Sequence, residues 1–233
     1  VLKTKDFPHL KSLKGQTLIT TNGETLLGAD DKAGIADIMT ALEQIVTNSI
    51  PHGNISVAFT PDEEIGRGAN HFDTKLFGAD FAYTVDGGAA GEIEYENFNA
   101  ASAEWTINGK NVHPGSAKNV MVNASLVAME INSMLPSCEV PEKTEGYEGF
   151  YHLCDIKGNV EIAHLYYIVR DHSTAAFEAK LNTLRLIEKH IKEKYGENTS
   201  RLAIEEQYKN MKEKILPCFH IVATAKRVTE SLG

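Results

Sequence analysis

Acidic residues recur at three places in the first part of the chain, in a pattern that could bind metal ions and activate water. Asp30 follows a short apolar stretch, Glu63 and Glu64 stand side by side, and Asp86 precedes two glycines. Carboxylates bind divalent cations, and of two adjacent glutamates one can ligate a metal while the other takes a proton from metal-bound water. Together the three motifs predict most of a two-metal hydrolase site.

Each motif also has an ordinary structural interpretation. A pair such as Asp30-Asp31 before a helix is a common N-cap, an Asp-Glu-Glu run is typical of an acidic loop tip, and Asp86 before a glycine is typical of a turn. A catalytic zinc normally has at least one imidazole ligand, and the nine histidines of this chain are scattered. Carboxylates held close together without their cations would repel one another, so at least one of them should have a raised pKa or be relieved by Lys32 or bulk water.

The elements that must position these residues can be inferred from apolar periodicity. Apolar residues recur at three- and four-residue spacing from Asp31 to about Asn48, which predicts an amphipathic helix. Apolar runs between turn residues predict strands at residues 16–20, 25–28, 55–59 and 81–85. The second and third acidic motifs then follow strand ends, where open α/β sheets bind ligands.

The character of the chain changes near residue 98, where the predicted order becomes βαββαβ. The segments are strand 100–107, helix 120–134, strands 149–155 and 161–171, helix 174–195 and strand 201–208. This order is typical of two helices on one face of a four-stranded antiparallel sheet. We therefore expect an α/β fold in which a catalytic domain, with a mixed central sheet flanked by helices, carries an inserted α+β ferredoxin-like lid domain. The expected boundaries are residues 1–97 for the catalytic domain, 98–210 for the lid and 211–233 for the return to the catalytic domain.

Composition excludes several classes of protein. The chain has 23 basic and 32 acidic residues, a net charge of −9, which disfavours nucleic-acid binding because phosphate contacts depend on Lys and Arg. It contains no apolar run of about 18 residues and no apolar leader segment, so no membrane association is expected. The three cysteines are far apart, which argues against a disulfide framework and favours a reducing, cytoplasmic setting.

Four motifs resemble those of the di-zinc exopeptidase family, which includes carboxypeptidase G, acetylornithine deacetylase and the tripeptide aminopeptidases of the peptidase T type. The motifs are Gly28-Ala29-Asp30-Asp31-Lys32-Ala33-Gly34, residues 60–69, Thr84-Val85-Asp86-Gly87-Gly88 and His113-Pro114-Gly115-Ser116-Ala117-Lys118. The resemblance covers essentially the whole chain.

The resemblance implies a role for each acidic residue. Asp30 would bridge two zinc ions, Glu64 would bind one of them and Asp86 the other, and Glu63 would act as general base. A cis peptide bond between Asp30 and Asp31 is also implied.

Two residues of the second domain also match the family. His113 is similar to the histidine that reaches the scissile carbonyl, and Arg170 is similar to an arginine that binds the substrate carboxylate. Without the resemblance, His113 would be interpreted as a turn residue and Arg170 as the partner of Asp155 or Asp171 in an ion pair.

The resemblance implies a zinc-dependent aminopeptidase that releases the N-terminal residue from tripeptides. Its substrate would be a small peptide, and a homodimer is a possible assembly. The family's remaining ligands are histidines in an upstream His-x-Asp segment and in a downstream segment, and neither is in this sequence. We therefore expect the chain to be the middle of a longer enzyme and to be inactive by itself. Two alternatives stay open, namely a related carboxypeptidase or N-acyl amino acid amidohydrolase, and a non-catalytic binding module.

Overall fold

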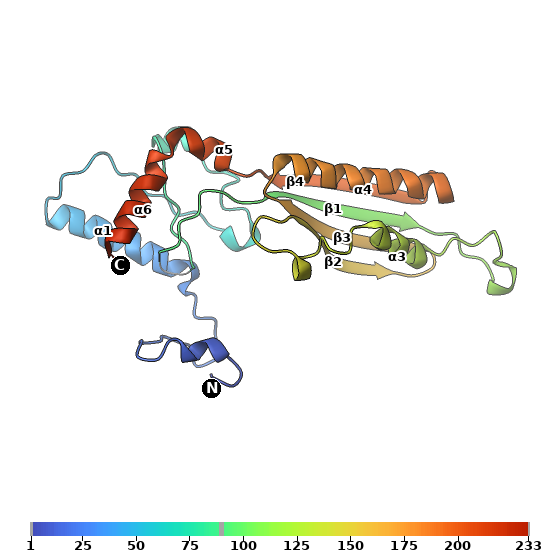
Figure 1. The fold of residues 1–233 in the computed structure, drawn as a ribbon, viewed down its shortest axis with the longest axis horizontal. Coiled ribbons are helices and arrows are strands. Elements are labelled where there is room, and N and C mark those ends of the chain that lie inside the picture. Colours follow the sequence, from blue (N-terminus) through green and yellow to red (C-terminus); the bar gives the residue numbers. More distant parts are fainter. Residues whose placement is uncertain (1, 89–90, 233) are drawn as a thin grey trace. The chain divides into compact units, whose positions relative to one another are not determined.

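The computed structural model describes residues 2–88 and 91–232, and the chain divides into two compact units (Figure 1). The first unit is Val1–Glu92 and the second is Ile93–Gly233. We describe each unit by itself.

The second unit is built on a four-stranded antiparallel sheet in the order β2-β3-β1-β4. Its strands are β1 (Asn99–Asn108), β2 (Phe150–Gly158), β3 (Ile162–Asp171) and β4 (Ser200–Tyr208). Helices α3 (Ala124–Met134) and α4 (Thr174–Tyr195) pack against each other and share one core with the strands (Figure 1). The predicted βαββαβ order and ferredoxin-like fold are therefore confirmed.

The alternation of side chains along each strand explains why one face of the sheet is buried. In β1 the buried large residues Trp105 and Ile107 lie on the same face as Ala101 and Ala103. Trp105 is paired with Leu165 of β3 and with Leu202 of β4, so its indole ring lies over the centre of the sheet. This apolar face is what the two helices cover.

The two helices present matching apolar stripes. In α4 the buried apolar residues recur every three or four positions, as an amphipathic helix requires, and they are Phe177, Leu181, Leu184, Ile187 and Ile191. Ser173 caps this helix, because its Oγ accepts a hydrogen bond from the Ala176 amide. Helix α3 begins later than predicted, because Asn123 accepts hydrogen bonds from the Ser125 and Leu126 amides and so makes the N-cap there.

The remaining elements of the second unit are short, except for one helix near the end of the chain. They are η3 (Pro114–Ser116), η4 (Pro141–Lys143), α5 (Lys212–Ile215), η5 (Leu216–Cys218) and α6 (His220–Leu232). The tail is mainly helical, as predicted, and its return to the catalytic domain stays a prediction. Within residues 2–88 and 91–232, no helix is both long enough and apolar enough to cross a membrane.

The first unit is dominated by helix α1 (Ala29–Thr47), whose C-cap is Asn48, near which the helix was predicted to end. Its other elements are η1 (Pro8–Lys11), η2 (Glu63–Ile65) and α2 (Thr74–Phe77). Asp30 and Asp31 have non-helical backbone angles inside α1, so the regular helix starts after them.

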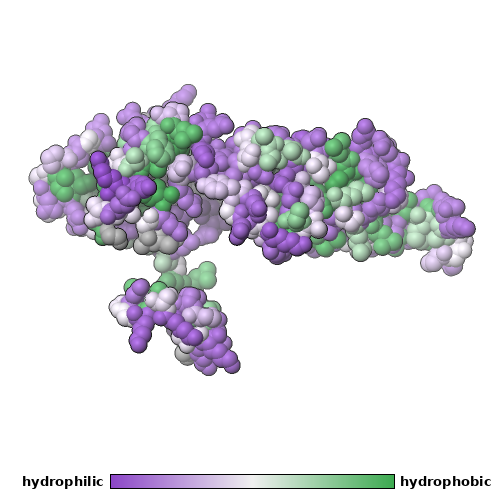
Figure 2. All heavy atoms as spheres, in the orientation of Figure 1, coloured by the Kyte–Doolittle hydropathy of each residue, from purple (hydrophilic) through white to green (hydrophobic). Residues whose placement is uncertain are grey.

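The strands predicted in this first unit are not formed in the described residues. Residues 16–20, 25–28, 55–59 and 81–85 make no ladder with another strand, and the mixed central sheet is therefore not seen in residues 2–88. A strand needs a partner to satisfy its backbone groups, and local alternation does not supply one. Many large apolar side chains consequently stay exposed here, among them Ile55, Val57, Phe59 and Phe81. Figure 2 shows hydrophobic residues, in green, at the molecular surface among hydrophilic ones, in purple.

Candidate active site

Asp30 and Asp86 meet in the first unit although 56 positions separate them in the sequence. The carboxylate of Asp30 lies against the backbone of Gly87, where an added Cβ atom would be 3.2 Å from both Cγ and Oδ1 of Asp30. The Asp30 and Asp86 side chains share a hydrogen bond, which together with the charge of Asp86 raises the pKa of Asp30 above its ordinary value of 3.8. The absence of a side chain at Gly87 therefore permits this close approach.

Glu63 and Glu64 lie close enough to this pair for their charges to interact. They form the short helix η2, which is bounded by Asp62 and Gly66, both in the left-handed conformation. Partial desolvation, followed by the negative charges of Asp86, Glu64 and Asp30, raises the pKa of Glu63 above 4.5. The charge of Glu64 also contributes to the raised pKa of Asp30. The structure thus brings the four predicted carboxylates into one electrostatically coupled cluster, and the predicted rise in pKa is confirmed.

The first turn of α1 is packed tightly against the segment that carries Asp86. Gly34 is buried, and a Cβ atom there would be 2.4 Å from Oδ1 of Asp31 and 2.8 Å from the carbonyl oxygen of Val85. The peptide bond between Asp30 and Asp31 is cis, as the resemblance implies. Nζ of Lys32 lies 3.5 Å from the carbonyl oxygen of Gly28, and among the described residues no salt bridge of Lys32 with these carboxylates is formed.

The donor set has the chemistry of a cation site but not its full geometry. Within the described residues, no group of three or more His, Cys, Asp or Glu side chains is placed to hold a metal ion. The adjacent carboxylates of Asp30 and Asp86, and the buried Oδ1 of Asp31 that lacks a partner among the described residues, match one side of a divalent-cation site. The described residues therefore fit part of a metal centre and do not complete one.

His113 and Arg170 belong to the second unit. His113 is exposed at the start of η3, and its Nδ1 accepts a hydrogen bond from the Gly115 amide at 3.1 Å. Arg170 lies on β3, where its Nη1 donates to the carbonyl oxygens of Ala101 and Val169 and its Nη2 donates to Oε1 of Gln207.

The alternative in which Arg170 forms an ion pair is wrong for the described residues. Asp171 lies 3.5 Å from Nζ of Lys180, and Asp155 lies 2.8 Å from Nζ of Lys157. Sequence reasoning missed Gln207 and Tyr208, which hold and stack on the Arg170 guanidinium from a strand that is distant in sequence. No local signal could have identified them, because strand pairing alone brings them near.

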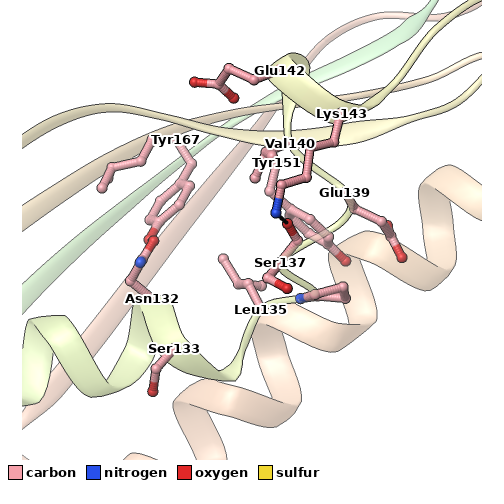
Figure 3. Close-up of a pocket in the computed structure, with 12 residues that line it drawn as sticks. Asn132, Ser133, Leu135, Ser137, Glu139, Val140, Glu142, Lys143, Tyr151 and Tyr167 are labelled. Atoms are coloured by element: carbon pink, nitrogen blue, oxygen red, sulfur yellow. Dashed lines mark hydrogen bonds between the residues drawn. The ribbon is translucent and has the colours of Figure 1, made fainter.

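A separate cavity of about 470 Å³ lies in the second unit, between the end of α3, the loop that follows it and the sheet (Figure 3). Tyr167 donates to Oδ1 of Asn132 at 2.9 Å, and Lys143 donates to the Ser137 carbonyl at 2.7 Å. Burial raises the pKa of Tyr151 in its wall to about 12, and Glu139 is paired with Lys180. Tyr167, Asn132, Lys143, Tyr151 and Glu139 are thus already engaged in hydrogen bonds or an ion pair, so the cavity is a weaker candidate than the carboxylate cluster.

Two family models match parts of the chain. Residues 95–199 match the peptidase dimerisation domain of the M20 peptidases, and residues 12–126 match the M42 glutamyl aminopeptidase model. Both models describe peptidases, and their matched ranges overlap between residues 95 and 126.

Matches over all or nearly all of this chain come from named relatives. Peptidase T of Clostridium novyi is 56% identical over 234 residues, a match that covers 100% of this chain and 58% of that protein. Peptidase T of Clostridium perfringens is 58% identical over 227 residues, which is 97% of this chain and 56% of that protein. The chain thus spans less than three fifths of the length of these relatives.

Two solved structures resemble the fold of this chain. The aminopeptidase PepT of Bacillus cereus superposes with a TM-score of 0.78 at 26% identity, covering 92% of this chain and 57% of that one. A tripeptidase of Staphylococcus aureus superposes with a TM-score of 0.72 at 25% identity, covering 82% and 52%. The sequence and structure matches confirm the resemblance that the motifs predict, and the matches to the two peptidase T proteins cover 100% and 97% of this chain.

Proposed function

We propose that this chain is the central part of a metal-dependent aminopeptidase that releases the N-terminal residue from tripeptides. All 233 residues of the chain are covered by the match to peptidase T of Clostridium novyi. The observation that carries the proposal is the coupled cluster of Asp30, Glu63, Glu64 and Asp86 in a sequence more than half identical to proteins named peptidase T. The chain covers 58% of that relative, so the activity is proposed for a full-length protein that contains it.

The metal ligands proposed within this chain are Asp30, Glu64 and Asp86, which would hold two zinc ions together with ligands from outside this sequence. When bound, the two ions would supply a water molecule acidified enough to attack a peptide carbonyl at neutral pH. The hydrogen bond with Asp86 and the negative charges of Asp86 and Glu64 raise the pKa of Asp30, and this supports the assignment because a cation would relieve the repulsion between these charges.

Glu63 is proposed as the general base. It is not needed as a ligand if Glu64 is one, and its raised pKa brings it closer to the range in which a carboxylate both accepts and returns a proton. Glu63 would accept the proton of the attacking water and deliver it to the leaving amine.

Two residues of the second unit are proposed to bind substrate. His113 would donate a hydrogen bond to the oxygen of the scissile carbonyl, on which negative charge develops. Arg170 would bind the C-terminal carboxylate of the peptide. Its Nη2 now donates to the neutral amide of Gln207, and the substrate carboxylate would replace that amide because a carboxylate is the stronger acceptor.

The wider setting is proposed on the same basis. The match to a peptidase dimerisation domain supports a homodimer, and the absence of spanning helices among the described residues is compatible with the proposed cytoplasmic location. We propose catalytic-domain boundaries of 1–97 and 211–233 around a lid of residues 98–210.

The test is turnover of a free tripeptide by a full-length protein that contains this sequence. Glu63→Gln keeps the shape of the side chain and removes its proton-accepting charge, so it should retain zinc and lose about 10²- to 10⁴-fold in kcat. Glu43→Gln, an exposed change on α1, is the matched control and should leave kcat unchanged. Near-normal turnover by Glu63→Gln would assign the base to another residue.

Two further measurements separate the alternatives. Cleavage of an N-acetylated tripeptide in preference to the free one would favour an amidohydrolase or carboxypeptidase. The 233-residue chain should bind zinc weakly in isothermal titration. In a cleavage assay it should not release the N-terminal residue of a tripeptide. Tight uptake of two zinc ions by this chain would show that the assigned ligand set is wrong, and failure of the full-length protein to bind zinc would favour a non-catalytic module.

A further inference from the structure

His113 is carried by an arm, residues 109–123, whose base is fixed to the sheet domain. The Gly109 amide donates to the Glu161 carbonyl at 2.7 Å, and Lys110 and Val122 exchange two backbone hydrogen bonds of 2.7 and 3.0 Å. A Cβ atom at Gly109 would lie 2.0 Å from the Val160 carbonyl oxygen. This contact leaves no room for any other residue, so the arm leaves the sheet in a defined direction.

The tip of the arm is a series of hydrogen-bonded turns. The Ser116 amide donates to the His113 carbonyl at 2.8 Å, and the amides of Val120 and Met121 both donate to the Ala117 carbonyl at 3.0 Å. Pro114 restricts the backbone directly after His113. The backbone around His113 is therefore ordered by local contacts alone.

The imidazole ring of His113 is held by the same turn. Its Nδ1 lies 3.1 Å from the Gly115 amide nitrogen, and a backbone N–H can only donate. Nδ1 must therefore present its lone pair, and in a neutral imidazole the proton is then on Nε2. A Cβ atom at residue 115 would be 3.1 Å from Nδ1 and 3.3 Å from Cε1, so the ring lies directly over this glycine.

We infer that Gly115 is a positioning residue for His113. It fixes the neutral imidazole in the Nε2–H tautomer and fixes the direction of the imidazole ring, so that Nε2 of His113 presents a hydrogen-bond donor. The exposed ring leaves Nε2 accessible, and no described residue is recorded as its partner. The functional meaning of this inference rests on the proposed function, in which that donor meets the developing oxyanion. The opposite tautomer would present a lone pair to the same oxygen and would repel it.

The direct test is NMR of the imidazole nitrogens in the ¹⁵N-labelled 233-residue chain, at a pH about two units above the ordinary imidazole pKa. We expect the proton of His113 on Nε2 alone, together with a ¹⁵N–¹⁵N coupling between Nδ1 and the Gly115 amide across their hydrogen bond. His52 supplies a reference in the same spectrum, because its Nδ1 lies 2.6 Å from the Gly53 carbonyl, which can only accept. A proton on Nδ1 of His113, two tautomers in comparable amounts, or no coupling to Gly115 would overturn the inference.

A pair of substitutions separates the two nitrogens in the full-length protein. His113→Asn keeps an acceptor at the δ position that can cap the Gly115 amide, but it removes the donor, so kcat should fall by about 10²- to 10³-fold while the Gly115 amide stays protected. His113→Gln can place an amide donor near the position of Nε2 but loses the cap, so the Gly115 amide should lose protection. Equal protection of that amide in both variants would overturn the role of Gly115.

The two hypotheses fail in different ways. If the coupling is present and the full-length protein does not cleave tripeptides, the proposed function fails and the tautomer assignment stands. If the protein cleaves tripeptides and the coupling is absent, the function stands and Gly115 loses its positioning role.

Discussion

Lys180 and Asp171 are a buried pair of opposite charges in the second unit. The Lys180 side chain is 10% exposed, contacts Glu139 and lies 3.5 Å from Asp171, which is 7% exposed. Lys180→Met would leave the Asp171 carboxylate buried without its cation, so we expect the free energy of unfolding to fall by about 3–5 kcal/mol in urea denaturation. Lys189→Met removes an ion pair in which both side chains are exposed and should cost less than about 1 kcal/mol. Equal losses in the two variants would contradict this difference.

Glu130 provides a prediction of pH dependence at the same scale. Burial alone would raise its pKa, but hydrogen bonds from Lys194 and Tyr195, both 2.6 Å long, more than offset this and lower the pKa below 4.5. A lowered pKa in the folded state stabilises the protein above pH 4.5, and that stabilisation is lost as the pH falls through the folded value. In urea denaturation at a series of pH values, Glu130→Gln should therefore lose less stability on acidification than the parent chain. Parallel pH profiles would show that this carboxylate does not contribute.

At the scale of elements, the stability of the second unit depends on the face that α4 turns to the sheet. Leu184 is fully buried in this helix, and Leu186, two positions later, is 57% exposed. Leu184→Ala leaves a cavity between helix and sheet and should lower the free energy of unfolding by about 2–5 kcal/mol. Leu186→Ala makes the same chemical change on the solvent side and should stay within about 0.5 kcal/mol of the parent. Thermal and urea denaturation measure both, and a large effect of Leu186→Ala would show that this face is covered in solution.

At the scale of the whole molecule, the hydrophobic core lies in the second unit. Every residue of the main buried cluster falls between Ala101 and Ile191, whereas Gly34 is the single buried residue among described residues 2–88. Hydrogen exchange should therefore show strong protection in β1, β3 and α4 and rapid exchange at residues 55–59 and 81–85. Limited proteolysis should remove the first unit before it cuts the sheet. Protection of residues 55–59 equal to that of β1 would show that these residues pair as strands in solution.

The sequence alone determined the elements whose signals are local. The predicted helix 174–195 and strands 100–107 and 161–171 were found as α4, β1 and β3, and their buried residues recur every three or four positions in α4 and mostly alternate in β1 and β3, as backbone geometry requires. The same alternation at residues 55–59 did not produce a strand, since pairing depends on a second segment and not on the first one alone. The acidic motifs were identifiable because a carboxylate residue that is followed closely by glycine usually forms a cap, a turn or a metal site.

Tertiary structure decided which of these residues meet. Asp30 and Asp86 come together beside Gly87, where a Cβ atom would be 3.2 Å from the Asp30 carboxylate, and Arg170 is held by Gln207 because β1 lies between β3 and β4. Neither contact has a signature at short sequence separation, since both depend on long-range packing. The tautomer of His113 depends partly on the local sequence and partly on the folded structure. The His-Pro-Gly motif is visible in the sequence, but only the folded turn shows that Nδ1 faces an N–H and leaves the proton to Nε2.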